Sequence, residues 1–174
     1  MASKYPVKGW IKGDFILAED SDIAREFYAR SRYGRIEEGR LWLSLYEGIL
    51  LQEMGKLLIL DGKQKEVHDV HRHLLKTKAS KTRYAVFSDL RRKGYIVKTA
   101  MKFGADFRVY DKGVKPGQDH ARWVVFAVHE SNKHTWKDFS AKMRVAHSTR
   151  KRLLLAVVDD ELDVTYWEAS WFRP

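Results

Sequence analysis

The sequence contains no cysteine, three prolines and no long apolar segment among its 174 residues. Without cysteine there is no disulfide framework, no thiolate metal site and no cysteine nucleophile. The longest apolar runs, 123–128 and 153–158, have six residues each, whereas a membrane-spanning helix needs about 20. The N-terminal residues also lack the apolar region of a signal peptide. These absences predict a folded cytoplasmic protein with no membrane segment.

Sequence patterns for metal and phosphate sites are also weak. The glycines of residues 113–119 do not match a known phosphate-binding loop. His68 and His71 share a helical face, but His73 does not, and no cysteine is present to complete a zinc site. We therefore expect no resident metal and no cofactor.

Positive charge is abundant and concentrated in the second half of the chain. Lysine and arginine number 33 against 23 acidic residues, and the formal charge is +10. Residues 1–80 carry +2 of this excess and residues 81–174 carry +8. Aromatic residues make up 13% of the sequence. Since cations bind phosphates and aromatic rings stack on bases, the composition predicts a nucleic acid partner held by the C-terminal half.

Apolar periodicity predicts two small domains, 1–80 and 81–174, because residues 76–83 between them show no apolar pattern. The first is expected to contain one or two strands within 5–18, helices over 23–33, 44–54 and 64–78, and a strand at 57–60. The second is expected to contain helices over 84–92 and 135–147, with strands at 95–100, 105–110, 121–128, 152–158 and 164–167. The fold class is α/β (α+β), in which an N-terminal mixed α/β domain precedes a C-terminal mixed sheet flanked by helices.

Three residues of the C-terminal half form a candidate catalytic set. Alternation along 105–110 places Tyr110 on the polar face of its strand. His120 opens the next strand after a loop, so the two residues meet if those strands pair. Lys151 stands at the mouth of the strand 152–158.

These three side chains suit RNA cleavage without metal. The 2′-hydroxyl needs a base, the 5′-oxygen leaving group needs an acid, and the pentavalent phosphate needs a fixed cation. Histidine can supply the acid, tyrosine is a weak base unless a cation assists it, and Lys151 provides a cation. Taken singly, each residue is better explained as a solvated side chain.

The sequence resembles archaeal tRNA-intron (tRNA-splicing) endonucleases over nearly its whole length. The C-terminal motifs are specific, because their spacing, their strand context and the three candidate residues agree. The segments that carry the resemblance are 101–110, His120 ten residues on, 150–160 and 163–167, with 33–36 and 43–51 in the N-terminal half. The C-terminal half is thereby identified as similar to the family's nuclease domain, and the protein as similar to its catalytic chain.

The resemblance implies a role for each of the three residues. Tyr110 would be the general base on the 2′-hydroxyl, His120 the general acid to the 5′-oxygen, and Lys151 the residue that stabilises the transition state. The family cleaves precursor tRNA at bulge-helix-bulge sites without metal, leaving a 2′,3′-cyclic phosphate and a 5′-hydroxyl. A non-catalytic RNA-binding or structural subunit of the same assembly is the alternative.

The resemblance also implies contacts with RNA and with other subunits. Arg144 matches an arginine that holds bulge nucleotides, and Trp167 or Tyr166 is expected to be a second stacking platform. The acidic turn is expected to dock into a basic pocket of a neighbouring subunit, through Asp159, Asp160, Glu161 and Asp163. The expected assembly is a homotetramer, or a heterotetramer with a separate structural subunit.

A metal-dependent nuclease of the restriction or resolvase type is a second alternative. Such an enzyme needs carboxylates that converge with a lysine. Glu130 and Asp106 are the nearest candidates, and the sequence offers no convincing set around them.

Overall fold

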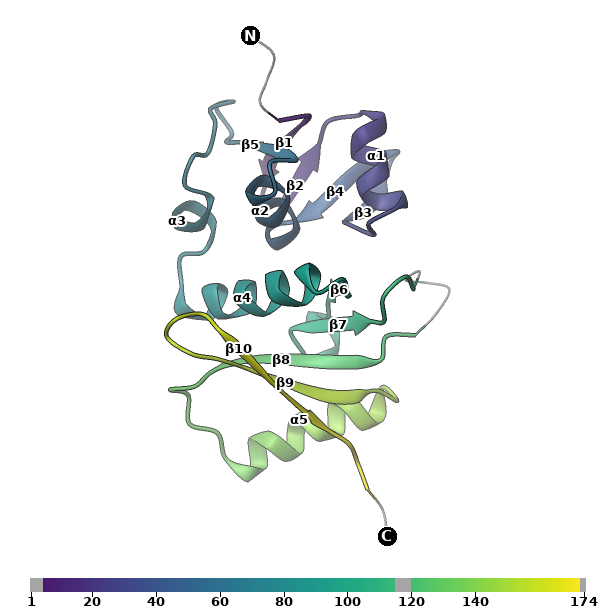
Figure 1. Cartoon of the computed structure of the whole chain (residues 1–174), viewed down its shortest axis with the longest axis vertical. Coiled ribbons are helices and arrows are strands. Elements are labelled where there is room, and N and C mark those ends of the chain that lie inside the picture. The colour runs from purple at the N-terminus through teal and green to yellow at the C-terminus, as the bar shows by residue number, and fades with distance from the viewer. Residues whose placement is uncertain (1–4, 115–119, 173–174) are drawn as a thin grey trace. The chain divides into compact units, whose positions relative to one another are not determined.

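The computed structural model describes residues 5–114 and 120–172 and divides into two compact units, Met1–Lys76 and Thr77–Pro174 (Figure 1). Each unit combines helices with a mixed sheet of five strands. This architecture confirms the predicted α+β class.

The first unit is built on a sheet with the strand order β3-β4-β2-β1-β5. Strands β1 and β5 are parallel, and the other neighbouring pairs are antiparallel. Its elements are β1 (Val7–Lys12), β2 (Phe15–Ala18), α1 (Asp22–Ala29), β3 (Arg35–Glu37), β4 (Arg40–Ser44), α2 (Leu45–Glu53), β5 (Leu57–Leu60) and α3 (Val70–Leu74).

Helix α2 is fixed to this sheet by a close contact and by a buried carboxylate. Gly48 lies so near Ile16 that a Cβ on it would sit 2.2 Å from the Ile16 Cδ1 atom. Glu47 is 5% exposed and accepts hydrogen bonds from the Gly34 N–H at 2.8 Å, the Ser44 N–H at 2.9 Å and the Ser44 hydroxyl at 2.9 Å. The carboxylate thus joins the start of α2 to the turn before β3.

Replacing Glu47 with alanine is expected to lower the free energy of unfolding by about 2–3 kcal/mol, because two backbone donors would lose a charged acceptor. Chemical denaturation of the full chain measures this loss. Glu47→Gln keeps one acceptor oxygen and should lose less. Equal stability of Glu47→Ala and the wild type would contradict the structural role of this carboxylate.

The second unit is built on a sheet with the order β10-β9-β8-β7-β6. Strands β8 and β9 are parallel and are joined through α5, while the other pairs are antiparallel. Its elements are α4 (Lys78–Arg92), β6 (Ile96–Thr99), the 3₁₀ turn η1 (Met101–Phe103), β7 (Phe107–Tyr110), β8 (Trp123–His129), α5 (Trp136–Ser148), β9 (Arg152–Val158) and β10 (Val164–Ala169).

Helices α4 and α5 cover opposite faces of this second sheet (Figure 1). On the α4 side, Phe87 packs against Phe107 with ring centroids 5.9 Å apart. On the α5 side, Met143 and Ala146 form one cluster with Val124 and Leu153. Since both faces are covered, β8 is apolar nearly throughout. This continuous apolar run is why the strand could be predicted from the sequence.

Three parts of the fold differ from the sequence-based expectation. The helix expected over 64–78 is limited to α3, because the Asp61 carboxylate shapes a turn with the N–H groups of Lys63 and Lys65, and the next residues pair with β5 through the Val67 N–H and the Ile59 carbonyl. Helix α4 begins inside the stretch expected to link the domains, where Thr77 and Ser80 form a capping box. The hairpin of β3 and β4 was not predicted, since its three-residue strand is too short for a periodic signal.

Candidate active site

Tyr110, His120 and Lys151 lie at the same end of the second sheet. Tyr110 is the last residue of β7, Lys151 directly precedes β9, and His120 comes shortly before β8. Hydrogen bonds continue the pairing beyond the strand ends: the Arg122 N–H donates to the Val109 carbonyl at 2.9 Å, and the Arg152 N–H donates to the Arg122 carbonyl at 3.0 Å. Because adjacent strands are about 4.8 Å apart, the backbones at Tyr110 and Lys151 lie about 10 Å apart.

The Tyr110 side chain does not lie on a solvent-exposed face, as the strand alternation predicted. It is 5% exposed and packs with Ile96 and Ala121, with the partly buried Val114 against the same cluster. The segment after β7 turns back through the Val114 N–H, which donates to the Asp111 carbonyl at 3.3 Å. Residues after the strand therefore cover a ring that strand alternation alone would expose.

Lys151 is held at the point where α5 ends and β9 begins. Its N–H donates to the Ala146 carbonyl at 2.8 Å, and its Nζ donates to the Thr149 carbonyl at 2.8 Å. Burial, followed by the positive charge of Arg108, lowers the pKa of the Lys151 ammonium from its usual 10.5. The amine is therefore a fixed, partly desolvated group with a second cation nearby.

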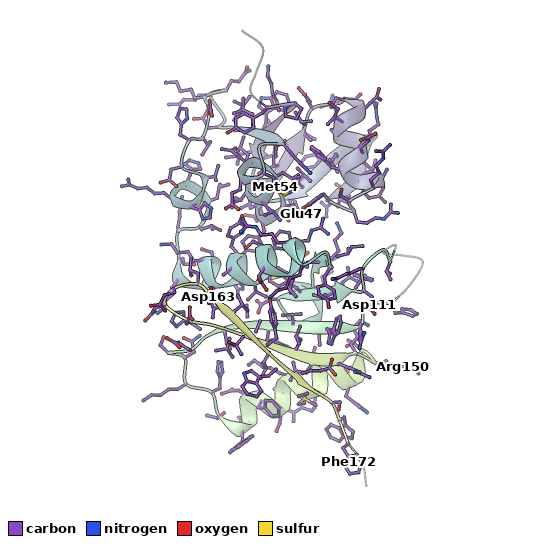
Figure 2. All side chains as sticks on the ribbon, in the orientation of Figure 1. Glu47, Met54, Asp111, Arg150, Asp163 and Phe172 are labelled. Carbon is purple, nitrogen blue, oxygen red and sulfur yellow. The ribbon has the colours of Figure 1, made fainter. Side chains whose placement is uncertain are left out.

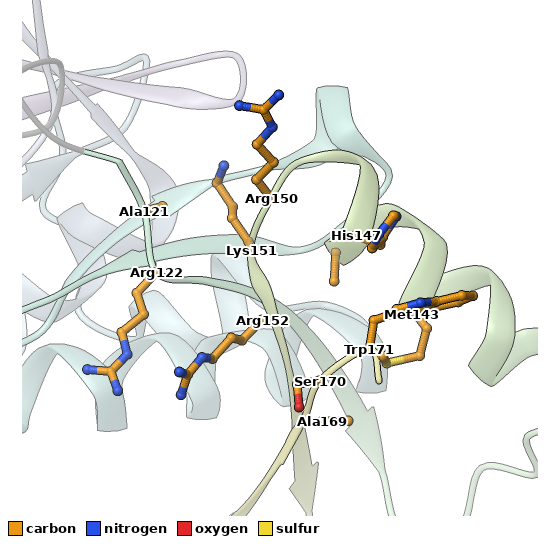
Figure 3. Close-up of a pocket in the computed structure, with 11 residues that line it drawn as sticks. Ala121, Arg122, Met143, His147, Arg150, Lys151, Arg152, Ala169, Ser170 and Trp171 are labelled. Carbon is orange, nitrogen blue, oxygen red and sulfur yellow. The ribbon is translucent and has the colours of Figure 1, made fainter. Parts of the chain in front are cut away.

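The residue before Lys151 adopts a strained backbone conformation. Arg150 has φ 54°, a region that favours glycine after a helix and costs other residues about 1–2 kcal/mol. The structure retains an arginine here, and Figure 3 shows its side chain extending in the same direction as that of Lys151. Strain of this kind is frequent at functional sites.

His120 is exposed at the entrance to β8. It follows residues 115–119, which lie outside the described part of the chain. Of the predicted loop 113–119, the structure therefore describes residues 113 and 114. The structure therefore places the His120 backbone at the same end of the sheet as Tyr110 and Lys151.

A pocket of about 540 Å³ opens beside Lys151 (Figure 3). Its floor includes Met143 and Ala146 of α5. Its wall contains an aromatic pair, in which the rings of His147 and Trp171 lie 5.1 Å apart at 41°. The cationic side chains that line it are Arg122, Arg150, Lys151 and Arg152. Such a pocket suits an anion that carries a flat ring, such as a nucleotide.

The two expected stacking residues of β10 lie on opposite faces of the sheet. Trp167 pairs with Leu155, which packs on the α5 side, where the exposed Arg144 also lies. Trp167 is 64% exposed. The Tyr166 hydroxyl donates to Asp89 of α4 at 2.6 Å, and burial together with that carboxylate raises the pKa of Tyr166.

The Tyr166 ring has a cation on its face. The Nζ of Lys93 lies 5.1 Å from the ring centroid. Of Tyr166 and Trp167, only Trp167 is both highly exposed and on the α5 side of the sheet, where Arg144 lies.

The acidic turn joins β9 to β10 at the opposite end of the sheet from Arg150 and Lys151, as Figure 2 shows for Asp163 and Arg150. The Asp159 carboxylate accepts from the Asp163 N–H at 2.8 Å and shapes the turn. Asp160 lies 3.2 Å from Nε2 of His129 and 3.5 Å from Nζ of Lys78. Glu161 is exposed at the tip.

The carboxylates considered for a metal site have other positions. Asp106 forms an ion pair with Arg83 at 2.6 Å and accepts from the Ala127 N–H at 2.9 Å, so it has a structural role. Glu130 is exposed after β8. Over residues 5–114 and 120–172, no group of three or more His, Cys, Asp or Glu residues could hold a metal ion. His71 of the histidine cluster pairs with Glu53 instead.

Among the described residues, no helix is long and apolar enough to cross a membrane.

Sequence reasoning missed Arg108 and the His147–Trp171 pair. Arg108 lies two residues before Tyr110, so strand alternation places both on one face of β7, and that signal was available. The His147–Trp171 contact joins residues far apart in the chain, and only the packing of the chain end against α5 reveals it.

Comparisons with known proteins show matches to both parts of the chain. Residues 80–166 match the family model of the tRNA intron endonuclease catalytic C-terminal domain, and residues 7–70 match that of its N-terminal domain. A tRNA-splicing endonuclease of Methanothermobacter thermautotrophicus is 39% identical, over 97% of this chain and 99% of its own.

Two further relatives carry the same name. The tRNA-splicing endonuclease of Pyrococcus furiosus is 38% identical over 98% of this chain and 99% of its own. That of Nanoarchaeum equitans is 39% identical over 76% of this chain and 90% of its own. The family predicted from the sequence motifs is confirmed: the chain belongs to the tRNA intron endonuclease family.

Proposed function

We propose that the chain is a tRNA-splicing endonuclease that cleaves precursor tRNA at intron boundaries. The observation that carries this proposal is the convergence of Tyr110, His120 and Lys151 on one end of the C-terminal sheet. The relatives named tRNA-splicing endonuclease, which match both domains, support the same function. The substrate is RNA, in keeping with the pocket of cations and aromatic rings beside Lys151.

The proposed reaction is a metal-independent transesterification. The Tyr110 oxygen, in its deprotonated form, accepts the proton of the 2′-hydroxyl, whose oxygen attacks the adjacent phosphorus. The bond from phosphorus to the 5′-oxygen breaks, and His120 donates a proton to that oxygen. Lys151 stabilises the negative charge on the pentavalent phosphate. The products are a 2′,3′-cyclic phosphate and a 5′-hydroxyl.

Substrate recognition is proposed to depend on bulge-helix-bulge structure. Arg144 and Trp167 would hold an unpaired nucleotide on the α5 side of the sheet. The ring of Trp171, which lines the Lys151 pocket, offers a further platform. Stacking of this kind contributes about 1–3 kcal/mol per base. A base within continuous duplex cannot reach these side chains, and this provides selectivity for bulges.

The proposal is tested with two RNAs of matched sequence. One contains a bulge-helix-bulge and the other is fully paired across the same position. We expect the full chain, with EDTA present, to cut only the bulged RNA. Equal cutting of both RNAs would contradict the proposed recognition, and cutting of neither would contradict the proposed activity.

Assembly is proposed to use the acidic turn, which would dock into a basic pocket of a neighbouring subunit. The product would be a homotetramer, or a heterotetramer with a separate structural subunit. The turn is acidic in a chain of formal charge +10, so its charge is opposite in sign to the net charge of another copy.

Reversing the charge at Glu161 and Asp163 should therefore weaken association. The variant Glu161→Lys/Asp163→Lys is expected to shift the mass seen by light scattering toward smaller species, with its circular dichroism unchanged. Lys133→Glu, which alters an exposed charge between β8 and α5, is the control. An unchanged assembly in the double variant would exclude the turn as a docking element.

A further inference from the structure

The sheet of the first unit has one buried and one partly exposed face. Ile16, Leu43 and Ile59 on the buried face are fully buried, and α2 approaches that face at Gly48. Burial alternates along β1, β2, β4 and β5, so the intervening residues form the second face and keep partial exposure. We call this second face the outer face; its central residues are Trp10, Leu17, Trp42 and Arg35.

These central residues form a row across adjacent strands. In the strand register, Trp10 pairs with Leu17, Leu17 with Trp42, and Trp42 with Arg35. Phe15 lies beside the row, with its ring edge-on to Trp42 at a centroid distance of 6.5 Å. The Arg35 guanidinium lies 4.6 Å from the centre of the Phe15 ring. The row thus contains two partly exposed tryptophan rings, and the cation of Arg35 lies at its end.

The charges on the outer face are mostly positive. Lys8 and Lys12 flank Trp10 on β1, and Arg40 lies two residues before Trp42 on β4; all three are exposed. Among the strand residues of this face that the structure describes, the single carboxylate is Glu37, which pairs with Arg35 at 2.9 Å.

Partly exposed aromatic rings flanked by cations on a sheet face match the requirements of unpaired RNA. Bases splayed from a single strand stack on aromatic side chains, while lysine and arginine neutralise the backbone phosphates. Tryptophan and arginine are also common in protein interfaces, but the exposed Lys8 and Lys12 beside Trp10 are unfavourable there and suit phosphates. We propose that the outer face of the N-terminal domain binds unpaired nucleotides of RNA, with bases on Trp10 and Trp42 and phosphates on Lys8, Lys12 and Arg40.

This inference gives the N-terminal domain a direct role in RNA binding. It rests on the proposed function only for the identity of the natural RNA, since the chemistry of the face requires no more than an unpaired strand. RNA bound there would be held by contacts separate from those of Tyr110, His120 and Lys151.

The test measures binding of a fluorescein-labelled, unstructured oligoribonucleotide to the full chain by anisotropy. Trp10→Ala/Trp42→Ala should weaken binding at least about 30-fold, because each of the two stacked bases contributes about 1–3 kcal/mol. The matched control is Trp136→Ala, which removes an 83% exposed tryptophan from α5 and should leave binding unchanged.

A second variant avoids the partly buried tryptophans. Lys8→Gln/Lys12→Gln replaces two exposed side chains, so the fold should be retained. The slope of log affinity against log salt should fall by about one for each lysine that contacts a phosphate. An unchanged slope and unchanged affinity in both double variants would overturn the inference. Loss of self-association with RNA affinity intact would also overturn it, because the face would then bind protein.

Failure of this inference is distinguishable from failure of the proposed function. If the wild type cleaves bulged RNA but both double variants bind the oligoribonucleotide normally, the inference alone is wrong. If the wild type does not cleave, yet the variants lose affinity as expected, the inference stands and the proposed function is wrong.

Discussion

Replacing His120 with alanine is expected to lower kcat by about 10²- to 10⁴-fold, the usual contribution of a general acid. KM should change little, because His120 is proposed to act on the leaving 5′-oxygen rather than in binding. Single-turnover cleavage of a bulged RNA by the full chain measures the effect on the chemical step.

A substrate with sulfur in place of the bridging 5′-oxygen separates this role from a structural one. A thiolate leaves without protonation, so His120→Ala should cleave this RNA at nearly the wild-type rate. Gln118 lies two residues earlier in the sequence, and Gln118→Ala provides a neighbouring control that should cleave both RNAs normally. An equally large defect of His120→Ala on both substrates would contradict the assignment of the general acid.

Replacing Lys151 with alanine is expected to lower kcat by about 10²- to 10³-fold, as does the loss of one group that stabilises an oxyanion. Lys151 is held by the Thr149 carbonyl, so the position of its charge is fixed before substrate binds. Lys151→Arg retains a cation and should recover part of the activity. An activity near that of the wild type for Lys151→Ala would exclude Lys151 from the transition state.

The pH dependence follows from the lowered pKa of Lys151. The protonated amine is the active form, and burial with the Arg108 charge lowers its pKa from 10.5. On the RNA with a bridging 5′-sulfur, whose cleavage needs no general acid, activity should therefore fall at a lower pH than for an ordinary lysine as the solution becomes alkaline. Arg108→Gln removes one cause of the shift and should move this alkaline loss to higher pH. Lys151→Arg should abolish it, because arginine stays charged.

The sequence predicted the fold best where burial is continuous or clearly amphipathic. Strands β8 and β9 and helix α5 lie close to their expected ranges, because apolar runs or a helical period mark them. The pattern Val67, Val70, Leu74 and Leu75 also has helical spacing, yet most of the expected helix does not form. There, hydrogen bonds to the Asp61 carboxylate favour a turn, and the Val67 N–H donates to the Ile59 carbonyl of β5. Apolar spacing contains no information about such hydrogen bonds.

The sequence predicted which residues form the candidate site, but it did not predict their burial or their packing partners. Strand pairing and motif spacing were enough to bring Tyr110 and His120 to one end of a sheet. The burial of Tyr110 depends on Val114 and Ala121 lying against its ring, and the sequence contains no periodic signal for that packing. Likewise, the separation of Tyr166 from Trp167 follows from the strand register and from the contact with Asp89.

The most direct test of the proposed reaction is identification of the RNA ends produced by the purified full chain in EDTA. The proposed transesterification predicts a 2′,3′-cyclic phosphate on the upstream fragment and a 5′-hydroxyl on the downstream fragment, with both formed about 10²- to 10³-fold more slowly by Lys151→Ala. Cleavage that requires added magnesium and leaves a 5′-phosphate would contradict it, because water rather than the 2′-hydroxyl would then be the nucleophile.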